Sequence, residues 1–456
     1  MKTIFISLFE GVEAKNILRT SILPVLLSQP DIRLVLFTKS RERAEYHKKE
    51  FRDPRIIFEV VSLPPPRGLD AVFMRLKFTL LRTPTTILMR KKLFEARGNF
   101  VNYRAASFLN WVFARPFFVR LARAADFLFV KNRAFAPSFE KYQPDLVFCA
   151  NLFDDTEIHM VREAKKVGVK TIGLINSWDR TTTRCILRLL PDMLICFSEC
   201  IQSELVRHDA IAPHRVYVGG IPHYDYHFSA PHENREEFCK KTGLDPAKRF
   251  IVFAPFGIAS SDSDWDIIDM LYRLNREGEF GNNVEVFVRF PPNDVLEKEE
   301  LEKRPYLKYD HPGILFTKQR SIDWDLDADG LKYLSDTLYH SAMVLTYASS
   351  ISIDAAAVGR PVININFEMQ KPGVFTRSPT FYYKKEYYQK ALRTGGIRLV
   401  NSEKELAFWV QRYLKNPSYD KENREHLVRE QCQFTDGKSG ERVGKYILGY
   451  LFKTLT

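Results

Sequence analysis

Short apolar runs alternate with amphipathic stretches along the chain, and glycine, proline and polar turns separate them. Seven apolar runs in the first half predict buried strands. They are Lys2–Phe9, Arg33–Thr38, Arg55–Val61, Asp145–Cys149, Lys170–Ile175, Met193–Phe197 and Arg215–Val218. Helices are predicted between these strands, including Val12–Leu27, Thr156–Val167 and Glu199–His208. Strands that alternate with helices form parallel sheets, so this half is predicted to be a Rossmann-like α/β domain.

The same alternation returns after a polar pause. The predicted strands of the second half are Phe250–Ala254, Val284–Phe290, Met343–Tyr347 and Val362–Ile365, and tail helices are predicted at Glu403–Leu414, Tyr419–Cys432 and Gly440–Phe452. We therefore expect an α/β fold with two Rossmann-like domains facing a central cleft. The expected boundaries are 1–223 for the first domain, 224–249 for a hinge, 250–435 for the second domain, and 436–456 for a helix that crosses back.

The stretch 343–367, MVLTYASSISIDAAAVGRPVININF, is the centre of the second half. It reads as strand, helix and strand, with Ser349 and Ser350 before the helix and Gly359 placed to end it. A helix start with flanking hydroxyls suits a phosphate, and Asp354 is positioned to accept hydrogen bonds from a ribose. The alternative is that the serines only cap the helix and Asp354 complements its dipole. The pattern is neither a Walker A loop nor GxGxxG.

Residues 71–134 form a basic insertion. They contain thirteen lysines and arginines against two acids, Glu95 and Asp126, within a net charge of +12 for the whole chain. Many aromatic and aliphatic side chains are interspersed among the cations. Basic and apolar residues at helical spacing predict helices that lie on an anionic membrane. The alternative is a pair of domain helices with solvated basic faces. No nucleic-acid reading motif accompanies the charge, so we expect no nucleic-acid partner.

The remaining composition favours the cytoplasm. The six cysteines have no second pair at zinc-ligand spacing, so buried, reduced thiols are expected. The first apolar run is too short for a secretory signal, and no apolar segment reaches the length of a membrane span. We expect a cytoplasmic protein, peripheral on the inner face of the cytoplasmic membrane if the basic insertion docks there. The acidic stretch Asp323–Asp327 is expected to be a solvated loop rather than a metal site.

Four motifs carry a resemblance to a known family. They are GLINSWDRTTTR (Gly173–Arg184), VYVGGIPHYD (Val216–Asp225), YASSISIDAAAVGRPVI (Tyr347–Ile363) and FTDGKSGERV (Phe434–Val443). The chain resembles GT-B glycosyltransferases, and within that fold it is similar to bacterial surface-polysaccharide transferases and CDP-glycerol glycerophosphotransferases. The non-hydrolysing sugar-nucleotide epimerases share the serine turn and the acidic residue at Asp354.

The resemblance implies a donor site in the second half. Ser349, Ser350 and Ser352 would contact the diphosphate and Asp354 the ribose. Arg289, at the end of a strand, would neutralise phosphate charge and assist the leaving group. Many relatives have a histidine before the proline there, whereas this chain has Phe290. Such enzymes usually need no metal, so neither a metal nor another cofactor is expected.

The first half is expected to supply the general base that removes the acceptor proton. Loops after strand ends place Asp179 first among the candidates, Asp155 second and Glu13 third. Trp178 beside Asp179 is expected to shield it from water. Each of the three is also suited to capping a helix.

These observations predict a metal-independent transferase that moves a sugar from a nucleotide-sugar donor to a glycan or lipid-linked acceptor. Three alternatives remain open. One is glycerophosphate transfer from CDP-glycerol, which releases CMP, and another is 2-epimerisation of a UDP-sugar without an acceptor. The third is a non-catalytic scaffold on a membrane surface.

Overall fold

The computed structural model describes residues 1–228, 231–316 and 324–454. The chain divides into two compact units. The first unit consists of Met1–His223 and Lys438–Thr456, and the second of Tyr224–Gly437. The first break therefore falls next to the expected boundary at 223. Residues 224–249, expected as a hinge, contribute α12 (Asp225–Phe228) and α13 (Arg235–Thr242) to the second unit.

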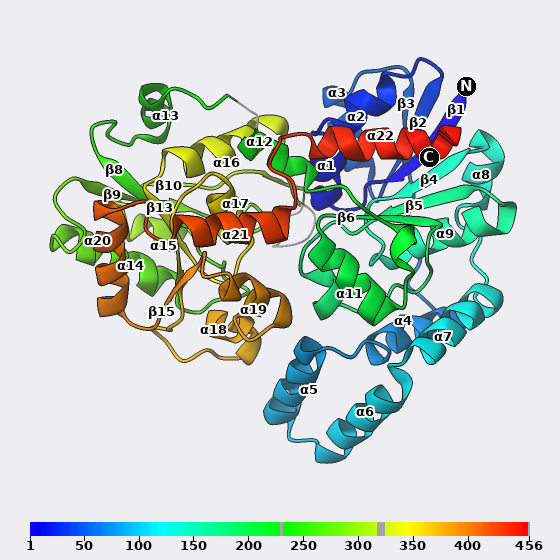
Figure 1. Ribbon diagram of the computed structural model, residues 1–456, viewed down its shortest axis with the longest axis horizontal. Helices are drawn as coiled ribbons and strands as arrows, with labels where there is room; N and C mark the ends of the chain where they lie inside the picture. Colours follow the sequence, from blue (N-terminus) through cyan, green and yellow to red (C-terminus); the bar gives the residue numbers. More distant parts are fainter. Residues whose placement is uncertain (229–230, 317–323, 455–456) are drawn as a thin grey trace. The chain divides into compact units, whose positions relative to one another are not determined.

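The first unit is built on a seven-stranded parallel sheet of order β3-β2-β1-β4-β5-β6-β7 (Figure 1). Its strands are β1 (Lys2–Ser7), β2 (Ile32–Thr38), β3 (Ile56–Val60), β4 (Leu146–Cys149), β5 (Lys170–Leu174), β6 (Met193–Cys196) and β7 (Val216–Val218). Leu34, Val35, Leu36 and Phe37 of β2 are all fully buried, as expected for a strand with helices on both faces. The sheet confirms the Rossmann-like class predicted for this half.

The helices of the first unit fall between its strands, except α22, which comes from the end of the chain. They are α1 (Gly11–Ile17), α2 (Ile22–Leu27), α3 (Arg41–Glu50), α4 (Gly68–Thr79), α5 (Pro84–Arg97), α6 (Phe100–Phe113), α7 (Pro116–Phe129), α8 (Ala136–Tyr142), α9 (Asp155–Val167), α10 (Arg180–Thr183), α11 (Glu199–Asp209) and α22 (Ser439–Phe452). The single helix predicted over Val12–Leu27 is wrong, because the chain breaks between α1 and α2. Thr20 turns its hydroxyl onto the carbonyl of Asn16 (2.8 Å), and Pro24 has no N–H to continue the helical ladder.

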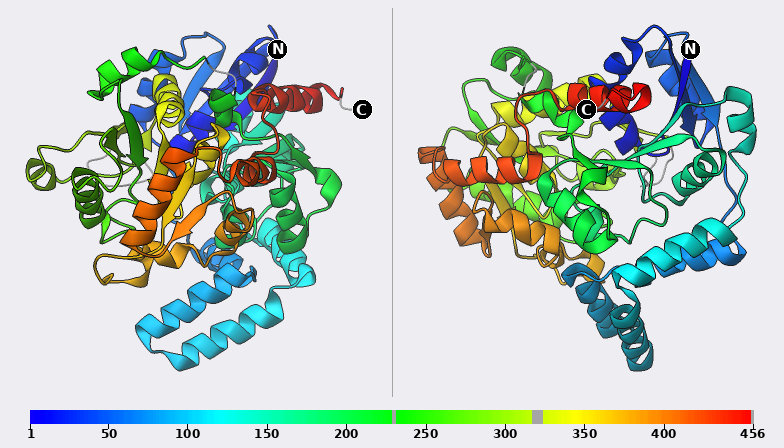
Figure 2. Two further views of the ribbon diagram at one scale, coloured as in Figure 1. Left: turned by 60° about the vertical axis from the view of Figure 1, so that its left-hand side comes forward. Right: turned by 45° about the vertical axis from the view of Figure 1, so that its right-hand side comes forward.

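The basic insertion forms four helices, α4 to α7, rather than the alternative pair. Helices α4 and α7 lie side by side next to the sheet, and α5 and α6 form a hairpin that projects away from it (Figures 1 and 2). Capping residues fix the ends of the two hairpin helices. Thr83 caps the start of α5 and Asn99 the start of α6, and Gly98 ends α5 in the left-handed conformation with φ 68°.

The second unit has a six-stranded parallel sheet of order β10-β9-β8-β13-β14-β15. Its strands are β8 (Arg249–Phe253), β9 (Val284–Arg289), β10 (Tyr309–Asp310), β13 (Met343–Thr346), β14 (Val362–Ile365) and β15 (Arg398–Val400), with a separate antiparallel pair β11 (Ile314–Leu315) and β12 (Trp324–Asp325). Its further helices are α14 (Asp264–Arg276), α15 (Lys298–Glu302), α16 (Ala328–His340), α17 (Ile351–Ala357), α18 (Pro379–Tyr382), α19 (Glu386–Arg393), α20 (Glu403–Lys415) and α21 (Lys421–Cys432). The predicted strand, helix and strand of the central stretch are β13, α17 and β14, with Gly359 at φ 77° after the helix.

Helix α22 belongs to the first unit although it lies more than 200 residues beyond the rest of it. It packs closely against α2, because Gly440 and Gly444 offer no side chain at the points of closest approach. A Cβ atom on Gly444 would lie 2.8 Å from Val25. The ring of Tyr446 stacks on Tyr217 at 3.9 Å, which ties α22 to β7 as well.

Candidate functional site

Polar side chains gather where three neighbouring strands of the first unit end. Strands β1, β4 and β5 are adjacent in the sheet, so the loops that follow their carboxyl ends are neighbours. Arg180 joins these loops: its guanidinium donates to Oδ1 of Asn151 at 2.6 Å and lies 3.4 Å from a carboxylate oxygen of Glu10. The loop of Asp179 is thereby held beside the loops of Glu10 and Asn151.

Asp179 lies at the start of α10 and is half-buried. Its carboxylate accepts a hydrogen bond from the hydroxyl of Ser177, and its backbone carbonyl accepts one from Thr183 at 2.8 Å. Among the described residues, no lysine or arginine forms an ion pair with this carboxylate. Asp179 therefore keeps acceptor capacity for a substrate hydroxyl.

Glu13 occupies a different position from the one expected of an accessible base. It is fully buried, and its carboxylate accepts from the backbone N–H groups of Phe9 and Glu10, which caps α1. Burial raises the pKa of Glu13 to about 8, and the charges of Glu10 and Asp154 contribute in the same direction. Glu13 is therefore protonated at neutral pH, in which form it accepts no further proton.

Glu157 is the buried neighbour of Glu13. Its carboxylate accepts from the backbone N–H of Asn151 at 2.8 Å. Burial raises the pKa of Glu157 well above its usual range, and the charge of Glu13 adds to the effect. Each of the two glutamates also buries one oxygen that has no hydrogen-bond partner in the described part of the chain. The pair is therefore kept largely uncharged beneath the loops.

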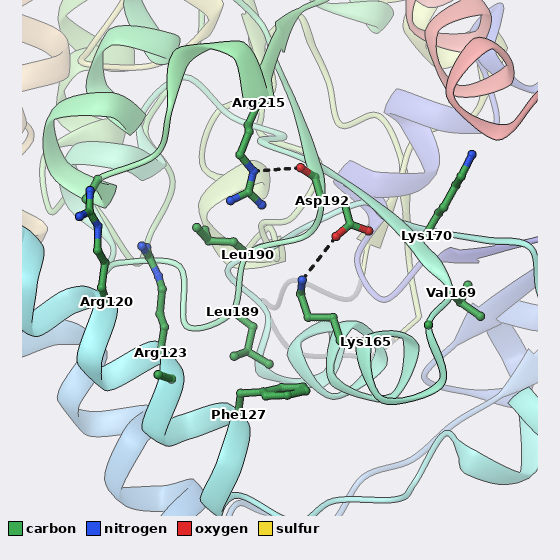
Figure 3. Close-up of a pocket in the computed structure, with 13 residues that line it drawn as sticks. Arg120, Arg123, Phe127, Lys165, Val169, Lys170, Leu189, Leu190, Asp192 and Arg215 are labelled. Atoms are coloured by element: carbon green, nitrogen blue, oxygen red, sulfur yellow. Dashed lines mark hydrogen bonds and ion pairs between the residues drawn. The ribbon is translucent and has the colours of Figure 1, made fainter. Parts of the chain in front are cut away.

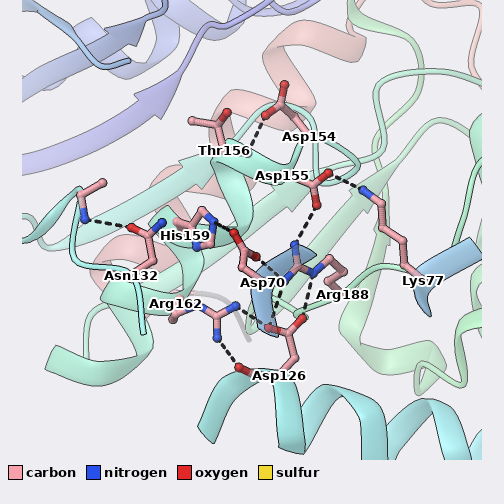
Figure 4. A network of polar contacts seen from close by, with 11 residues as sticks. Asp70, Lys77, Asp126, Asn132, Asp154, Asp155, Thr156, His159, Arg162 and Arg188 are labelled. Atoms are coloured by element: carbon pink, nitrogen blue, oxygen red, sulfur yellow. Dashed lines mark hydrogen bonds and ion pairs between the residues drawn. The ribbon is translucent and has the colours of Figure 1, made fainter. Parts of the chain in front are cut away.

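The carboxylate of Asp155 points toward Lys77 of the basic insertion (Figure 4). It is the first residue of α9, and Asp154 before it caps the helix by accepting from Thr156 at 2.7 Å. The carboxylate of Asp155 forms ion pairs with Lys77 of α4 at 2.7 Å and with Arg188 at 2.9 Å. Both carboxylate oxygens are thus engaged by cations of the protein, and this arrangement speaks against the catalytic role predicted for Asp155.

Arg188 is the centre of this polar network, which links α4, α7 and α9 (Figure 4). Besides Asp155 it contacts Asp70 at 2.7 Å and Asp126 at 2.8 Å, and Arg162 also pairs with Asp126. Although burial opposes it, hydrogen bonds from His159 and Arg188 lower the pKa of Asp70 to about 2. The network therefore anchors the basic insertion to the domain through charge-assisted hydrogen bonds.

In the second unit, the structure separates the three predicted serines. Ser350 is exposed at the start of α17, and Ser349 beside it is half-buried. Ser352 is fully buried, and its hydroxyl bonds with Asn364 at 3.1 Å and with Tyr388 at 2.8 Å. Ser349 and Ser350 are thus placed to meet a ligand at the strand ends, whereas the side chain of Ser352 is directed into the core.

The two charged residues predicted for the donor site also have partners inside the second unit. Oδ1 of Asp354 lies 3.0 Å from Nε2 of His227, and the other ring nitrogen of His227 lies 3.1 Å from the hydroxyl of Ser335. Arg289 ends β9 as predicted, but it is buried and pairs with Asp310. Ligand contacts by Asp354 or Arg289 would therefore require these internal bonds to be shared.

Sequence analysis missed a second polar cluster in this unit. Asp264, at the start of α14, accepts from the backbone N–H of Gly257 at 2.7 Å, and Asp294 accepts from that of Ile258 at 3.0 Å. Burial raises the pKa of Asp264 to about 6. These residues follow β8 and β9; β8 adjoins β13 and β9 adjoins β8, so they share the carboxyl edge of the sheet with Ser349. The available signal was the largely polar run Ser260–Asp266, which begins six residues after the end of a predicted strand.

The structure gives no support for a metal site within the residues it describes, where no three His, Cys, Asp or Glu side chains are grouped to hold an ion. The expectation of a solvated loop at 323–327 is wrong for Asp325, which is fully buried in β12. Asp327 caps α16 by accepting from Gly330 at 2.8 Å. Asp323 lies outside the described residues. Five of the six cysteines are buried, as expected, whereas Cys200 is half-buried.

The two parallel sheets define the class of protein. The fold is similar to that of MnaA of S. aureus in complex with UDP (TM-score 0.52, 13% identity, 99% of this chain and 97% of the other covered). It is also similar to UDP-GlcNAc 2-epimerase of Neisseria meningitidis bound to UDP-GlcNAc (TM-score 0.55, 10% identity, 98% of this chain and 100% of the other covered). A third similar structure is the wall teichoic acid polymerase TagF (TM-score 0.51, 13% identity, 100% of this chain and 90% of the other covered). The chain therefore has the GT-B fold, as predicted.

The sequence identifies the family within that class. The model of the CDP-Glycerol:Poly(glycerophosphate) glycerophosphotransferase family matches residues 191–449, which is more than half of the chain. The protein belongs to this family and is a transferase of glycopolymer biosynthesis. Comparison with curated proteins gives no match. The family's activity is glycerophosphate transfer, which differs from the sugar transfer that sequence analysis favoured.

Proposed function

We propose that the protein transfers a glycerol phosphate unit from a CDP-activated donor to a hydroxyl of a growing polymer. The observation that carries the proposal is the family match over residues 191–449, which spans the whole second unit with its serine turn. Glycerophosphate transfer was an alternative of the sequence analysis, and the family match raises it above transfer of a sugar.

In this reaction, the acceptor oxygen attacks the phosphorus of the glycerol phosphate group. The bond from that phosphorus to the oxygen of CMP breaks, so CMP leaves with the bonding electrons and a new phosphodiester forms. The acceptor proton must go to a base. Asp179 is our candidate because its carboxylate is half-buried, lies at the carboxyl end of β5 and has no cation partner among the described residues.

The donor is assigned to the second unit. Ser349 and Ser350 lie at the end of β13, where hydroxyl and backbone N–H groups suit a diphosphate. Asp264 lies on the same sheet edge, and the raised pKa of its carboxyl leaves part of the population uncharged near neutral pH. A partly neutral carboxyl repels a diphosphate less than a fully ionised one.

Sugar transfer is the second candidate. The observation that favours it is Phe290, which replaces the histidine that many relatives have before the proline after β9. A changed residue beside the predicted phosphate site is consistent with a different donor. The expected donor would then be a nucleotide-sugar, and a nucleoside diphosphate would leave instead of CMP.

Product analysis tests the proposal. The purified protein is incubated with CDP-glycerol or UDP-GlcNAc, each with and without a short poly(glycerophosphate) primer, and the released nucleotide is separated by chromatography. We expect CMP from CDP-glycerol only when the primer is present. Release of UDP would support sugar transfer, and conversion of UDP-GlcNAc without primer would support epimerisation. Absence of any turnover, with lipid binding retained, would support the scaffold alternative.

We also propose that the basic insertion docks on an anionic membrane. Large apolar side chains are exposed over α4 to α7, among them Phe117 (69% exposed), Leu121 (54%) and Leu128 (66%). Basic residues such as Arg75, Arg104 and Arg115 are exposed on the same helices. No helix among the described residues is both long and apolar enough to cross a bilayer. An interfacial position is therefore the membrane contact that this insertion suits best.

Vesicle binding tests this docking. Phe117→Ser, Leu121→Ser and Leu128→Ser together should abolish sedimentation with vesicles that contain phosphatidylglycerol. The matched control is Phe408→Ser with Val374→Ser, which removes apolar side chains exposed on the second unit. If the native protein does not sediment with these vesicles at low salt, the proposed docking is wrong.

A further inference from the structure

A basic pocket lies at the amino-terminal edge of the first sheet, the edge opposite the loop of Asp179. Its volume is about 760 Å³. Lys170 begins β5, Asp192 directly precedes β6 and Arg215 directly precedes β7, so three strand starts form one wall. Helix α7 forms another wall. The pocket is thus separate from the candidate site at the carboxyl ends of the strands.

The charges that line the pocket are mostly positive. Arg120 and Arg123 rise from α7 on one side and Lys165 from α9 on the other, with Phe127 and Leu189 between them (Figure 3). Asp192 is the carboxylate of the lining, and it already accepts from the N–H and hydroxyl of Thr171 at 2.8 Å. The pocket therefore has a surplus of donors with an apolar floor.

The cations that line the pocket differ in whether a carboxylate neutralises their charge. Arg123 is neutralised, because its guanidinium pairs with the buried carboxylate of Asp209 at 2.7 Å. Arg215 donates only to the backbone carbonyls of Asp192 and Pro191, which carry no full charge. Among the described residues, no carboxylate pairs with Arg120 or Arg215, and Lys165 lies 3.5 Å from Asp192.

The guanidinium of Arg123 is also repelled by neighbouring positive charges. Burial lowers the pKa of Arg123, and the nearby charges of Arg215 and Arg120 lower it further, while Asp209 acts in the opposite direction. Arg123 therefore lies close enough to Arg120 and Arg215 for their charges to repel it. An anion bound beside them would relieve this repulsion and accept hydrogen bonds from Arg120 and Arg215.

The pocket adjoins the exposed apolar stripe of α7. Residues 120, 123, 124 and 127 recur at spacings of three and four, so they share the helix face that lines the pocket. Residues 117, 121 and 128 form the neighbouring stripe of the same helix, and they are the apolar side chains proposed above to enter a membrane surface. A ligand in the pocket would therefore lie at the level of that surface.

We infer that this pocket binds the phosphate headgroup of an anionic phospholipid, with Arg120, Lys165 and Arg215 as the phosphate ligands. The inference rests on the proposed docking of the insertion on a membrane. A lipid headgroup fits better than a hydrophilic polyphosphate chain, because Phe127, Leu189 and the stripe of α7 offer apolar contact to the glycerol and acyl portions.

The experiment separates headgroup binding from membrane docking by using a soluble lipid. Dihexanoyl phosphatidylglycerol, below its micelle concentration, is titrated into the protein by calorimetry, with dihexanoyl phosphatidylcholine and inorganic phosphate as comparison probes. We expect saturable binding of phosphatidylglycerol, with phosphatidylcholine and phosphate both weaker. Arg120→Gln with Lys165→Gln should weaken phosphatidylglycerol binding about tenfold or more. The control, Lys91→Gln with Arg104→Gln, removes the same charge elsewhere on the insertion and should leave it unchanged.

Four outcomes would overturn the inference. If the pocket variant and its control lose the same amount of phosphatidylglycerol affinity, only the overall charge of the protein matters. If inorganic phosphate binds as tightly as the soluble lipid, the pocket is a simple anion site. Tighter binding of a short poly(glycerophosphate) chain would mean a polymer site, and no saturable lipid binding would mean no site. If the native protein ignores vesicles but binds the soluble lipid as described, membrane docking fails while the headgroup pocket stands.

Discussion

Nζ of Lys77 lies 2.7 Å from one carboxylate oxygen of Asp155, and a guanidinium nitrogen of Arg188 lies 2.9 Å from the other. The first contact joins α4 of the basic insertion to the start of α9 in the domain core. A residue that the sequence offered as a general base is therefore part of the anchor that fixes the insertion in place.

This assignment predicts how Asp155→Asn will behave. Removing the charge weakens two charge-assisted hydrogen bonds, each worth about 1.5–3 kcal/mol, so the free energy of unfolding should fall by an amount of that order. Turnover per folded molecule should stay within a few-fold of native. Urea denaturation and specific activity measure the two effects. Glu95→Gln, in an exposed pair with Lys92, is the control that should change neither. A large loss of turnover at unchanged stability would restore Asp155 as a base.

Asp179→Asn should show the opposite pattern. A general base acts in the chemical step, so kcat should fall by roughly 10²–10⁴-fold while nucleotide affinity and stability stay nearly constant. Single-turnover kinetics with labelled donor and calorimetry with CMP give the two numbers. Ser177→Ala, which removes only the hydroxyl donor to Asp179, should cause a much smaller loss of rate. Near-native turnover in Asp179→Asn would exclude this residue.

Arg289 requires a paired test because the side chain of its partner, Asp310, is only 14% exposed. Arg289→Ala alone should destabilise the second unit by about 3 kcal/mol, since it leaves a largely buried carboxylate without its cation. Arg289→Met combined with Asp310→Asn should recover most of that loss in thermal denaturation. Nucleotide affinity is then measured in the stable double variant. A loss of tenfold or more there would assign Arg289 to the donor phosphates, and an unchanged affinity would leave it a structural role only.

The buried pair of glutamates predicts a dependence of stability on pH. The folded state holds the proton of Glu13 up to about pH 8, whereas an unfolded glutamate loses it near its ordinary value of 4.5. The contribution of Glu13 to the free energy of unfolding therefore falls as pH rises from 4.5 to 8, by about 1.4 kcal/mol for each pH unit. Glu13→Gln retains a side-chain oxygen that can accept the capping hydrogen bonds of α1 but cannot titrate, so the melting temperature of this variant should vary less across this range. Glu140→Gln, at an exposed position, should follow the native curve.

The seven strands of the first sheet and four of the six strands of the second followed from the apolar pattern, because burial on both faces of a parallel sheet leaves a local signature in the sequence. The short strands β10 and β15 were not predicted. The direction in which individual side chains point did not follow from that pattern. Ser352 faces the core because Tyr388 and Asn364, from α19 and β14, supply its partners there. Asp354 likewise faces His227, 127 positions earlier in the chain. Such partners are distant in sequence, so the motif alone could not distinguish a ligand contact from an internal bond.

Partners that are distant in sequence also explain why the candidate general bases could not be distinguished by their motifs. Asp155 and Asp179 both follow a strand end, and their sequence positions are equivalent in that respect. They differ because Lys77 and Arg188 reach only Asp155. The partner on α4 belongs to an insertion whose packing the sequence did not reveal. Asp264 was not predicted for a related reason, since it shares its cluster with Asp294, 30 positions later in the chain.

The return of α22 to the first unit affects the order in which the two units fold during synthesis. Gly440 and Gly444 pack against α2, and Tyr446 stacks on Tyr217, so one side of the first unit is completed by residues far from the rest of it. During translation, residues 1–223 leave the ribosome while this side is still uncovered. The second unit is synthesised entirely within that interval. We expect the second unit to fold first as an independent body, and the first to reach its final stability only after synthesis has passed residue 452.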